Sequence, residues 1–274
     1  MAATPLAPPS AKDLMSALGK RGPHRVLRGD LALAGLPGVV LTPAEGLGLP
    51  AVAFAHGWMQ PAARYSGTFA HLASWGIVVA APATQRGPLP SHLELASDLR
   101  TALDICANVR LGPGEISVQP ARVAVAGHGM GAGAAVLAAA RQPGIKAVVG
   151  LAPAATSPSA VTAAANCAMP GLFLAAQSKA KVVLPGPAES IAGAWQGPVV
   201  LRRVQKSTEL GFAEGRHWSN TALDGSPERK TQQVARALLT GFLLRHLTGD
   251  KSYDELLSDA ATIPRTELVD PPQV

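Results

Sequence analysis

The chain has 274 residues, of which 47% are hydrophobic and 15% are charged, and its formal net charge is +6. The low charge and high apolar content exclude a disordered protein, and the two cysteines exclude a disulfide scaffold. One large α/β domain commonly has ~250 residues. We therefore expect a single domain at residues 21–258, with an N-terminal tail at 1–20 and a C-terminal tail at 259–274.

The positive charge raises the question of nucleic-acid binding. Such a protein would concentrate Lys and Arg on one stripe, interleaved with aromatic side chains that stack on bases. Here the basic residues are scattered and only 4% of residues are aromatic. We expect no nucleic-acid partner.

Signals for a membrane, a secretory route or a metal are weak as well. The first ten residues lack the basic and apolar regions of a signal peptide, and no apolar run reaches the ~18 residues of a membrane span. Cys106, Cys167 and the seven histidines show no ligand spacing. The expectation is a cytoplasmic protein without a membrane span, a metal or a cofactor.

Short runs rich in Val, Ile and Ala predict eight strands. The first two alternate polar and apolar residues, which favours a hairpin at a sheet edge, whereas the later runs are almost continuously apolar, as in parallel strands buried on both faces. The predicted strands are residues 24–34, 38–43, 51–56, 77–81, 122–127, 147–151, 171–176 and 199–204.

Helical patterns fill the intervals between these runs. Ser91, with Glu94 three residues on, forms a capping box, and residues 227–247 carry an apolar stripe at helical spacing. The predicted helices are residues 62–75, 91–109, 129–141 and 227–247. Alternating strands and helices indicate a mostly parallel eight-stranded sheet flanked by helices, with no separate lid domain.

The most informative stretch is the junction between the strand at 122–127 and the next helix. Residues 127–133 are G-H-G-M-G-A-G. A strand, a tight turn of small residues and a helix form the context of the G-x-S-x-G nucleophile elbow, in which the turn lifts the central side chain above the sheet. The central residue here is Gly129, which offers no nucleophile.

Two further segments occur in the same order as landmarks of a known family. Residues 55–58 (A-H-G-W) resemble an oxyanion loop, and residues 215–220 (G-R-H-W-S-N) resemble a segment that carries a catalytic histidine. Together with the elbow, they make residues 24–247 resemble the α/β-hydrolase superfamily, most closely its cutinase-like and dienelactone-hydrolase-like polyester and lipid esterases.

This resemblance implies roles for several residues. His217 matches the histidine of the triad, and the backbone amides of Trp58 and Met130 match the oxyanion hole. His128 and Trp218 are expected to line the ligand cleft, with His128 making packing or hydrogen-bonding contacts.

The departures from the family pattern concern the chemistry itself. Gly129 replaces the nucleophilic serine. Lys179 stands at the position of the acid, where a cation opposes the stabilisation of an imidazolium. Residues 152–155 (A-P-A-A) lack the aromatic substrate clamp of the polyester relatives. The resemblance therefore implies a catalytically inactive or altered hydrolase that binds an acyl or apolar ligand, or a protein partner.

Two alternatives stay open. In the first, the protein is a carboxylic ester hydrolase with a rewired nucleophile, for which Ser66, Ser178 and Ser219 are candidates and Glu189 is a candidate partner of His217. In the second, the junction binds a nucleotide, because it also satisfies G-x-G-x-x-A. The acidic residue expected ~20 positions later is missing, which disfavours nucleotide binding.

Overall fold

The computed structural model describes residues 9–177, 185–218, 220 and 225–272. Ser178, Lys179 and Ser219 lie outside the described residues, so the predictions made for them stay predictions.

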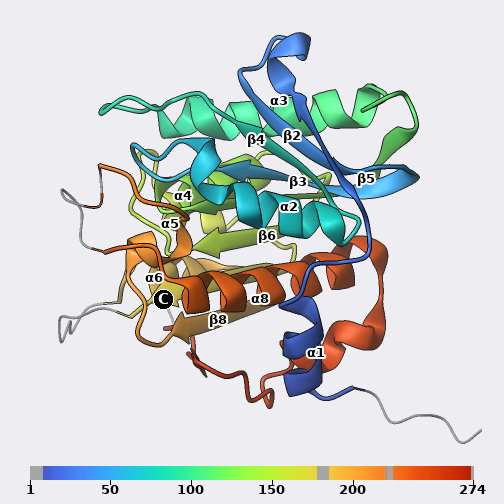
Figure 1. The fold of residues 1–274 in the computed structure, drawn as a ribbon. Coiled ribbons are helices and arrows are strands. Elements are labelled where there is room, and N and C mark those ends of the chain that lie inside the picture. Colours follow the sequence, from blue (N-terminus) through green and yellow to red (C-terminus); the bar gives the residue numbers. More distant parts are fainter. Residues whose placement is uncertain (1–8, 178–184, 219, 221–224, 273–274) are drawn as a thin grey trace, which may run out of the picture.

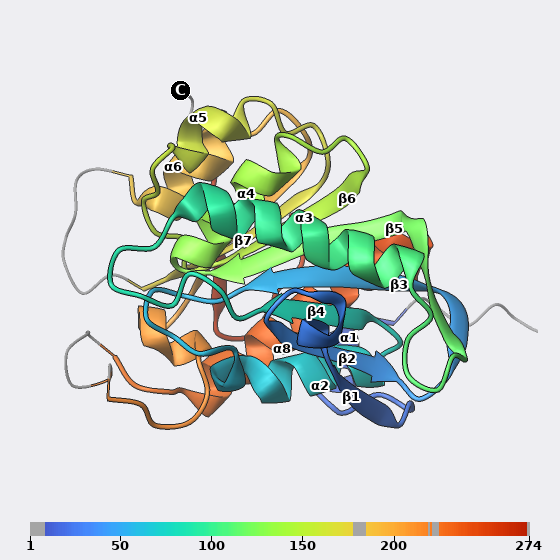
Figure 2. The ribbon, with the colours of Figure 1, turned by 90° about the horizontal axis from the view of Figure 1, so that it is seen from above.

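The described part of the chain forms one nine-stranded sheet covered by helices on both faces (Figures 1 and 2). The strand order is β1-β2-β4-β3-β5-β6-β7-β8-β9. The strands are β1 (Val26–Asp30), β2 (Gly38–Pro43), β3 (Gly46–Ala55), β4 (Val78–Pro82), β5 (Ile116–His128), β6 (Ile145–Leu151), β7 (Gly171–Ala176), β8 (Val199–Val204) and β9 (Thr266–Leu268).

The centre of the sheet is parallel and its edges are antiparallel. Strands β4, β3, β5, β6, β7 and β8 run parallel to one another. The outer pairs, β1 with β2, β2 with β4, and β8 with β9, are antiparallel. The predicted mostly parallel sheet and the predicted edge hairpin are thereby confirmed.

Each face of the sheet has its own group of helices. One face packs against α3 (His92–Asn108), α4 (Met130–Ala139), α5 (Ala160–Ala164) and α6 (Pro187–Ala194). The other packs against α1 (Ala11–Leu18), α2 (Ser66–Ser74), α8 (Arg229–Thr248) and α9 (Asp254–Leu257). Short 3-10 helices follow several loops: η1 (Leu31–Ala34), η2 (Ala62–Tyr65), η3 (Glu209–Phe212) and η4 (Lys251–Tyr253).

The two-sided burial of the sheet follows from strand geometry. Successive side chains of a strand point to opposite faces, so a strand between two helical layers must be apolar at every position. In β3, Ala51 and Ala53 join the core beneath α3 and α4, while Val52 and Phe54 join the core beneath α2 and α8.

Several elements differ from the sequence prediction, among them helices α5, α6 and α9, which were not predicted. The first strand ends at Asp30, whose carboxylate accepts the amide of Ala32 and so begins η1. Residues 11–18, within the expected N-terminal tail, form α1, which packs on α8. A ninth strand, β9, lies in the expected C-terminal tail and pairs with β8, because β8 otherwise leaves its outer backbone groups unpaired.

Among the described residues, no helix combines the length and the apolar character that crossing a bilayer requires.

Candidate functional site

The turn between β5 and α4, residues 127–131, is called the elbow below. Gly129 has φ 57° and ψ −122°, a conformation that is costly for a residue with a side chain and free for glycine. A Cβ placed on Gly129 would meet only the Cα of Gly57, at 3.7 Å. The elbow therefore keeps the geometry that presents a side chain and has room for one.

The glycines on either side of Gly129 are required by packing. A Cβ on Gly127 would lie 2.2 Å from the backbone of Gly131, and a Cβ on Gly131 would lie 2.3 Å from the carbonyl oxygen of Ala55. Both distances are far inside van der Waals contact, so strand β5 and helix α4 can approach one another and β3 only with glycine at these positions.

Two residues that line the same cavity as Gly129 contribute backbone amides from different elements. Met130 N–H is the first amide of α4, and Trp58 N–H belongs to the loop after β3. Over residues 9–177, 185–218, 220 and 225–272, neither amide has a hydrogen-bond acceptor. An unbonded amide pair of this kind, one of them at a helix N-terminus, suits a carbonyl or carboxylate oxygen.

A buried chain of hydrogen bonds holds the loop that carries Trp58. The amide of Gly57 donates to the Tyr65 hydroxyl at 3.0 Å, and that hydroxyl lies 2.8 Å from Nδ1 of His128. Nε2 of His128 lies 2.8 Å from the carbonyl oxygen of Glu209 in η3. The only assignment that satisfies every group has Tyr65 donating to Nδ1 and Nε2–H donating to Glu209.

Burial determines the protonation of His128. The residue is 3% exposed, and this desolvation lowers its pKa to about 4, with smaller contributions from nearby groups. A neutral imidazole matches the hydrogen-bond chain, in which Nδ1 must accept. His128 therefore connects β5, η2 and η3 as a structural residue and presents no proton donor or acceptor for catalysis.

The elbow opens into a cavity of about 540 Å³, called the elbow cavity. This volume lies within the range of small-molecule sites. Its described lining is Gly57, Trp58, Gln60, Pro88, Leu89, Pro90, His92, His128, Gly129, Met130, Ala154, Ala155, Glu209 and Leu210. None of these described lining residues carries a hydroxyl, a thiol or an amine.

The structure brings four predicted residues together at this cavity and places others elsewhere. Trp58, His128, Gly129 and Met130 line it. His217 lines a second cavity, of about 570 Å³, at the start of α8. Trp218 is exposed, and its ring lies 5.3 Å from that of His217, measured between centroids.

Two residues that were candidates for a rewired active site, Ser66 and Glu189, are described by the structure, and neither is a described lining residue of the elbow cavity. Ser66 is exposed at the start of α2 and is not among the described lining residues of the elbow cavity. Glu189 lies in α6, where its carboxylate bonds Arg203 at 3.0 Å.

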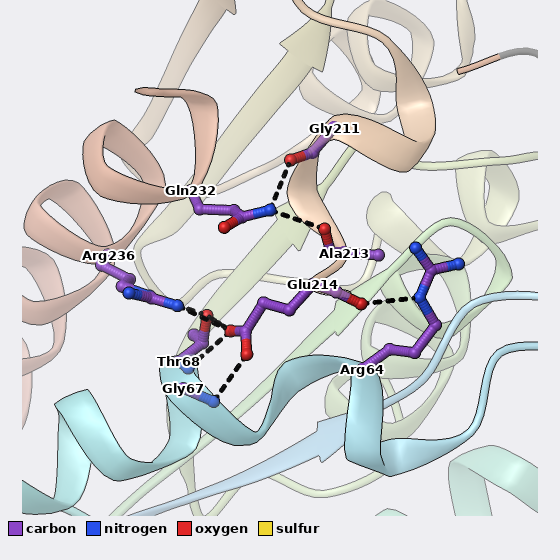
Figure 3. Close-up of polar contacts among 8 residues, drawn as sticks. All are labelled: Arg64, Gly67, Thr68, Gly211, Ala213, Glu214, Gln232 and Arg236. Atoms are coloured by element: carbon purple, nitrogen blue, oxygen red, sulfur yellow. Dashed lines mark hydrogen bonds and ion pairs between the residues drawn. The ribbon is translucent and has the colours of Figure 1, made fainter. Parts of the chain in front are cut away.

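A polar cluster beside the elbow cavity was missed by the sequence analysis (Figure 3). The carboxylate of Glu214 accepts the amides of Gly67 at 2.6 Å and Thr68 at 2.7 Å, the Thr68 hydroxyl at 2.8 Å, and Arg236 at 2.8 Å. Tyr65, the residue before α2, provides no side-chain cap. Glu214 therefore caps α2 from far along the chain, and we call these contacts the Glu214 cluster.

Close packing and a second arginine complete this arrangement. A Cβ on Gly67 would lie 2.8 Å from the Glu214 carboxylate and 2.7 Å from Arg236 Nη2, so a larger residue would require these side chains to shift. Arg64 donates to the backbone oxygens of Glu214 and Gly215, both at 2.9 Å. One feature of the sequence could have indicated the cluster: Gly67 lies in the first turn of a helix that has no capping side chain of its own.

In the part of the chain that the structure describes, no three His, Cys, Asp or Glu side chains gather in a way that could hold a metal ion.

Comparison with protein families gives one match. A family model described as PET hydrolase-like covers residues 8–262. No curated protein matches the chain.

Proposed function

The chain belongs to the PET hydrolase-like family, and from this premise we propose that it binds a small apolar ester or acyl compound in the elbow cavity without forming an acyl-enzyme. The family membership makes it an α/β-hydrolase of the esterase type. The observation that carries the proposal is the lining of the elbow cavity. The cavity keeps an unbonded amide pair, while its described lining has no hydroxyl, thiol or amine that could attack a carbonyl.

The polarity of the elbow cavity defines the ligand class. Trp58, Pro88 and Leu89 give it an apolar wall, and Leu89 is 94% exposed at its rim. The amides of Trp58 and Met130 supply two hydrogen-bond donors at the elbow. A ligand with a carbonyl oxygen on an apolar body matches both features.

We propose that Gly129, Lys179 and His217 occupy the positions of nucleophile, acid and base. With the first two substituted, an acyl-enzyme cannot form at the elbow. Loss of the nucleophile of a triad costs about 10⁶ in turnover.

A backbone substitution tests the binding mode. Proline is tolerated at the first position of a helix, where it removes an amide that has no helical partner. Met130→Pro deletes the N–H, and Met130→Ala is the control that loses the same buried side chain but keeps the N–H. We expect Met130→Pro to bind ethyl benzoate roughly five- to tenfold more weakly than Met130→Ala in calorimetric titrations, the value of one hydrogen bond.

Labelling with a fluorophosphonate probe tests the missing nucleophile. We expect the wild-type protein to remain unlabelled, as judged by intact-mass spectrometry. Covalent modification of any serine, Ser66, Ser178 and Ser219 included, would establish the alternative of an ester hydrolase with a rewired nucleophile. Equal binding of ethyl benzoate by the two Met130 variants would show that the Met130 N–H does not bind the ligand.

A further inference from the structure

The second cavity, called the α8 cavity, lies at the N-terminus of the longest described helix. It has a volume of about 570 Å³. Its described lining is Gly215, Arg216, His217, Asn220, Ser226, Pro227, Arg229 and Gln232. This set contains two arginines and one histidine and no carboxylate, whereas the described lining of the elbow cavity includes Glu209 and no arginine.

Among the residues that the structure describes, the two arginines have no partner for their charge. Arg216 and Arg229 are exposed, and across the described residues neither guanidinium makes a hydrogen bond or an ion pair. Other arginines of this region are occupied: Arg64 bonds backbone oxygens and Arg236 bonds Glu214. Two guanidinium groups that are free to bind a ligand therefore line the same hollow of the surface.

Basic side chains outnumber acidic ones at the start of α8. A helix N-terminus carries a partial positive charge and favours acidic residues. The first turn of α8 instead holds Arg229 and Lys230 and no acidic residue. Glu228, the residue before the helix, directs its carboxylate to the hydroxyls of Thr208 and Thr231, at 2.8 and 2.6 Å. The hydroxyls of Thr208 and Thr231 thus engage the one carboxylate at this helix start, and a bound anion would add negative charge beside the two cations.

The walls of the α8 cavity are held in place by hydrogen bonds. The carbonyl of Gly215 accepts from Arg64 at 2.9 Å, and the side chain of Asn220 bridges the amide of His217 and the carbonyl of Gly225. Gln232 is 8% exposed and donates to Ala213 at 2.7 Å. A site whose walls are fixed in advance loses little conformational entropy when a ligand binds.

We propose that the α8 cavity binds a small organic anion, whose phosphate or carboxylate group is held by the guanidinium groups of Arg216 and Arg229. Guanidinium groups present a planar fork of N–H donors that matches both oxyanions. The volume of the cavity admits an organic body as well as the anionic group. This site is separate from the elbow cavity and does not depend on the function proposed for it.

Calorimetric titration of the full chain with phenyl phosphate, benzoate and inorganic phosphate tests the proposal. We expect phenyl phosphate or benzoate to bind with a Kd below about 1 mM at low salt. The double variant Arg216→Gln, Arg229→Gln should weaken this binding at least about tenfold, since each charge-assisted bond contributes more than a neutral one. Both side chains are exposed, so the variant keeps its fold.

Two control variants distinguish binding in the α8 cavity from attraction to general surface charge and from binding in the elbow cavity. Lys230→Gln removes one positive charge, half of what the double variant removes, from the helical turn of Arg229 but outside the described lining, and we expect it to weaken binding by less than about threefold. Ala155→Trp fills the mouth of the elbow cavity and should leave anion binding unchanged. Tighter binding of the organic anions than of inorganic phosphate would show that the organic part of the ligand also contacts the α8 cavity.

Three results would overturn the proposal. They are no binding of any probe, equal binding by the double variant and the wild type, and loss of binding in Ala155→Trp. The last result would move the anion to the elbow cavity. If Lys230→Gln and the double variant weakened binding equally, general surface charge would explain the binding.

Discussion

The elbow and the Glu214 cluster are neighbours that keep their shapes by different physical means. The elbow is fixed by close packing of backbone, where Gly127 and Gly131 leave no space even for a methyl group. The Glu214 cluster is fixed by hydrogen bonds among residues from α2, α8 and the loop before His217. A shape maintained by backbone packing does not depend on the side chain at its centre, so the elbow holds its geometry with glycine at position 129.

We expect the largest effect on ester hydrolysis, from substitutions that place a nucleophile at the centre of the elbow. Gly129→Ser with Lys179→Asp restores a nucleophile and an acid to the positions proposed for them. We expect hydrolysis of p-nitrophenyl butyrate at least about a hundredfold above the wild type, the value of general-base assistance. Adding His217→Ala should abolish the gain. A folded double variant without any gain would contradict the proposed positions.

Packing at the elbow predicts the next effect. Gly127→Ala places a methyl group 2.2 Å from the backbone of Gly131. We expect the free energy of unfolding to fall by about 3 kcal/mol or more, the upper range for overpacking, as measured by urea denaturation. Gly144→Ala is the control, because a Cβ there meets nothing within 4 Å and we expect almost no change. Similar stabilities of the two variants would show that the elbow relaxes.

The buried histidine of the elbow, His128, predicts a pH dependence. Burial lowers the pKa of His128 to about 4 in the folded state from its ordinary value of 6.5. Its neutral form therefore stabilises the fold fully above pH ~6.5, and this contribution, of about 3 kcal/mol, is lost as the pH falls towards 4. Burial lowers the pKa of His71 to about 4 as well.

A substitution of His128 separates its contribution to the pH dependence from that of His71. We expect the fall in unfolding free energy between pH 7 and pH 4.5 to be smaller in His128→Gln than in the wild type. Parallel pH curves for the two proteins would refute a neutral, buried His128.

The smallest of these effects concerns the charge in the Glu214 cluster. Glu214→Gln replaces one acceptor oxygen by a donor that faces other donors, at a cost of about 2 kcal/mol. Glu189→Gln, which breaks the ion pair with the partly exposed Arg203, should cost less than about 1 kcal/mol. Equal costs in urea denaturation would show that the cap on α2 contributes nothing beyond an ordinary ion pair.

The parallel core was predictable because its signals are local. Strands β7 and β8 have the predicted bounds, since an apolar run between turn residues defines a strand buried on both faces. The elbow was predictable for a related reason, because small residues at fixed spacing are needed wherever a strand turns tightly into a helix.

The elements that escaped prediction depend on distant partners, with helix α1 as an exception. Helix α1 has a local signal that was overlooked, Ser10 as its cap with Leu14 and Leu18 four residues apart. Strand β9 exists only because β8 offers an open edge. The Glu214 cluster joins residues with no recognisable spacing in the sequence, and the site of His217 depends on how the loop around Glu214 is anchored.

The cap on α2 also governs the order in which the protein can fold during synthesis. Glu214 is made 147 residues after Gly67, the helical residue whose amide it accepts. At ~5–20 residues per second, the ribosome adds that length in roughly 7–30 s. Throughout this interval the first turn of α2 lacks its acceptor, so α2 completes its docking only when the C-terminal third of the chain has emerged.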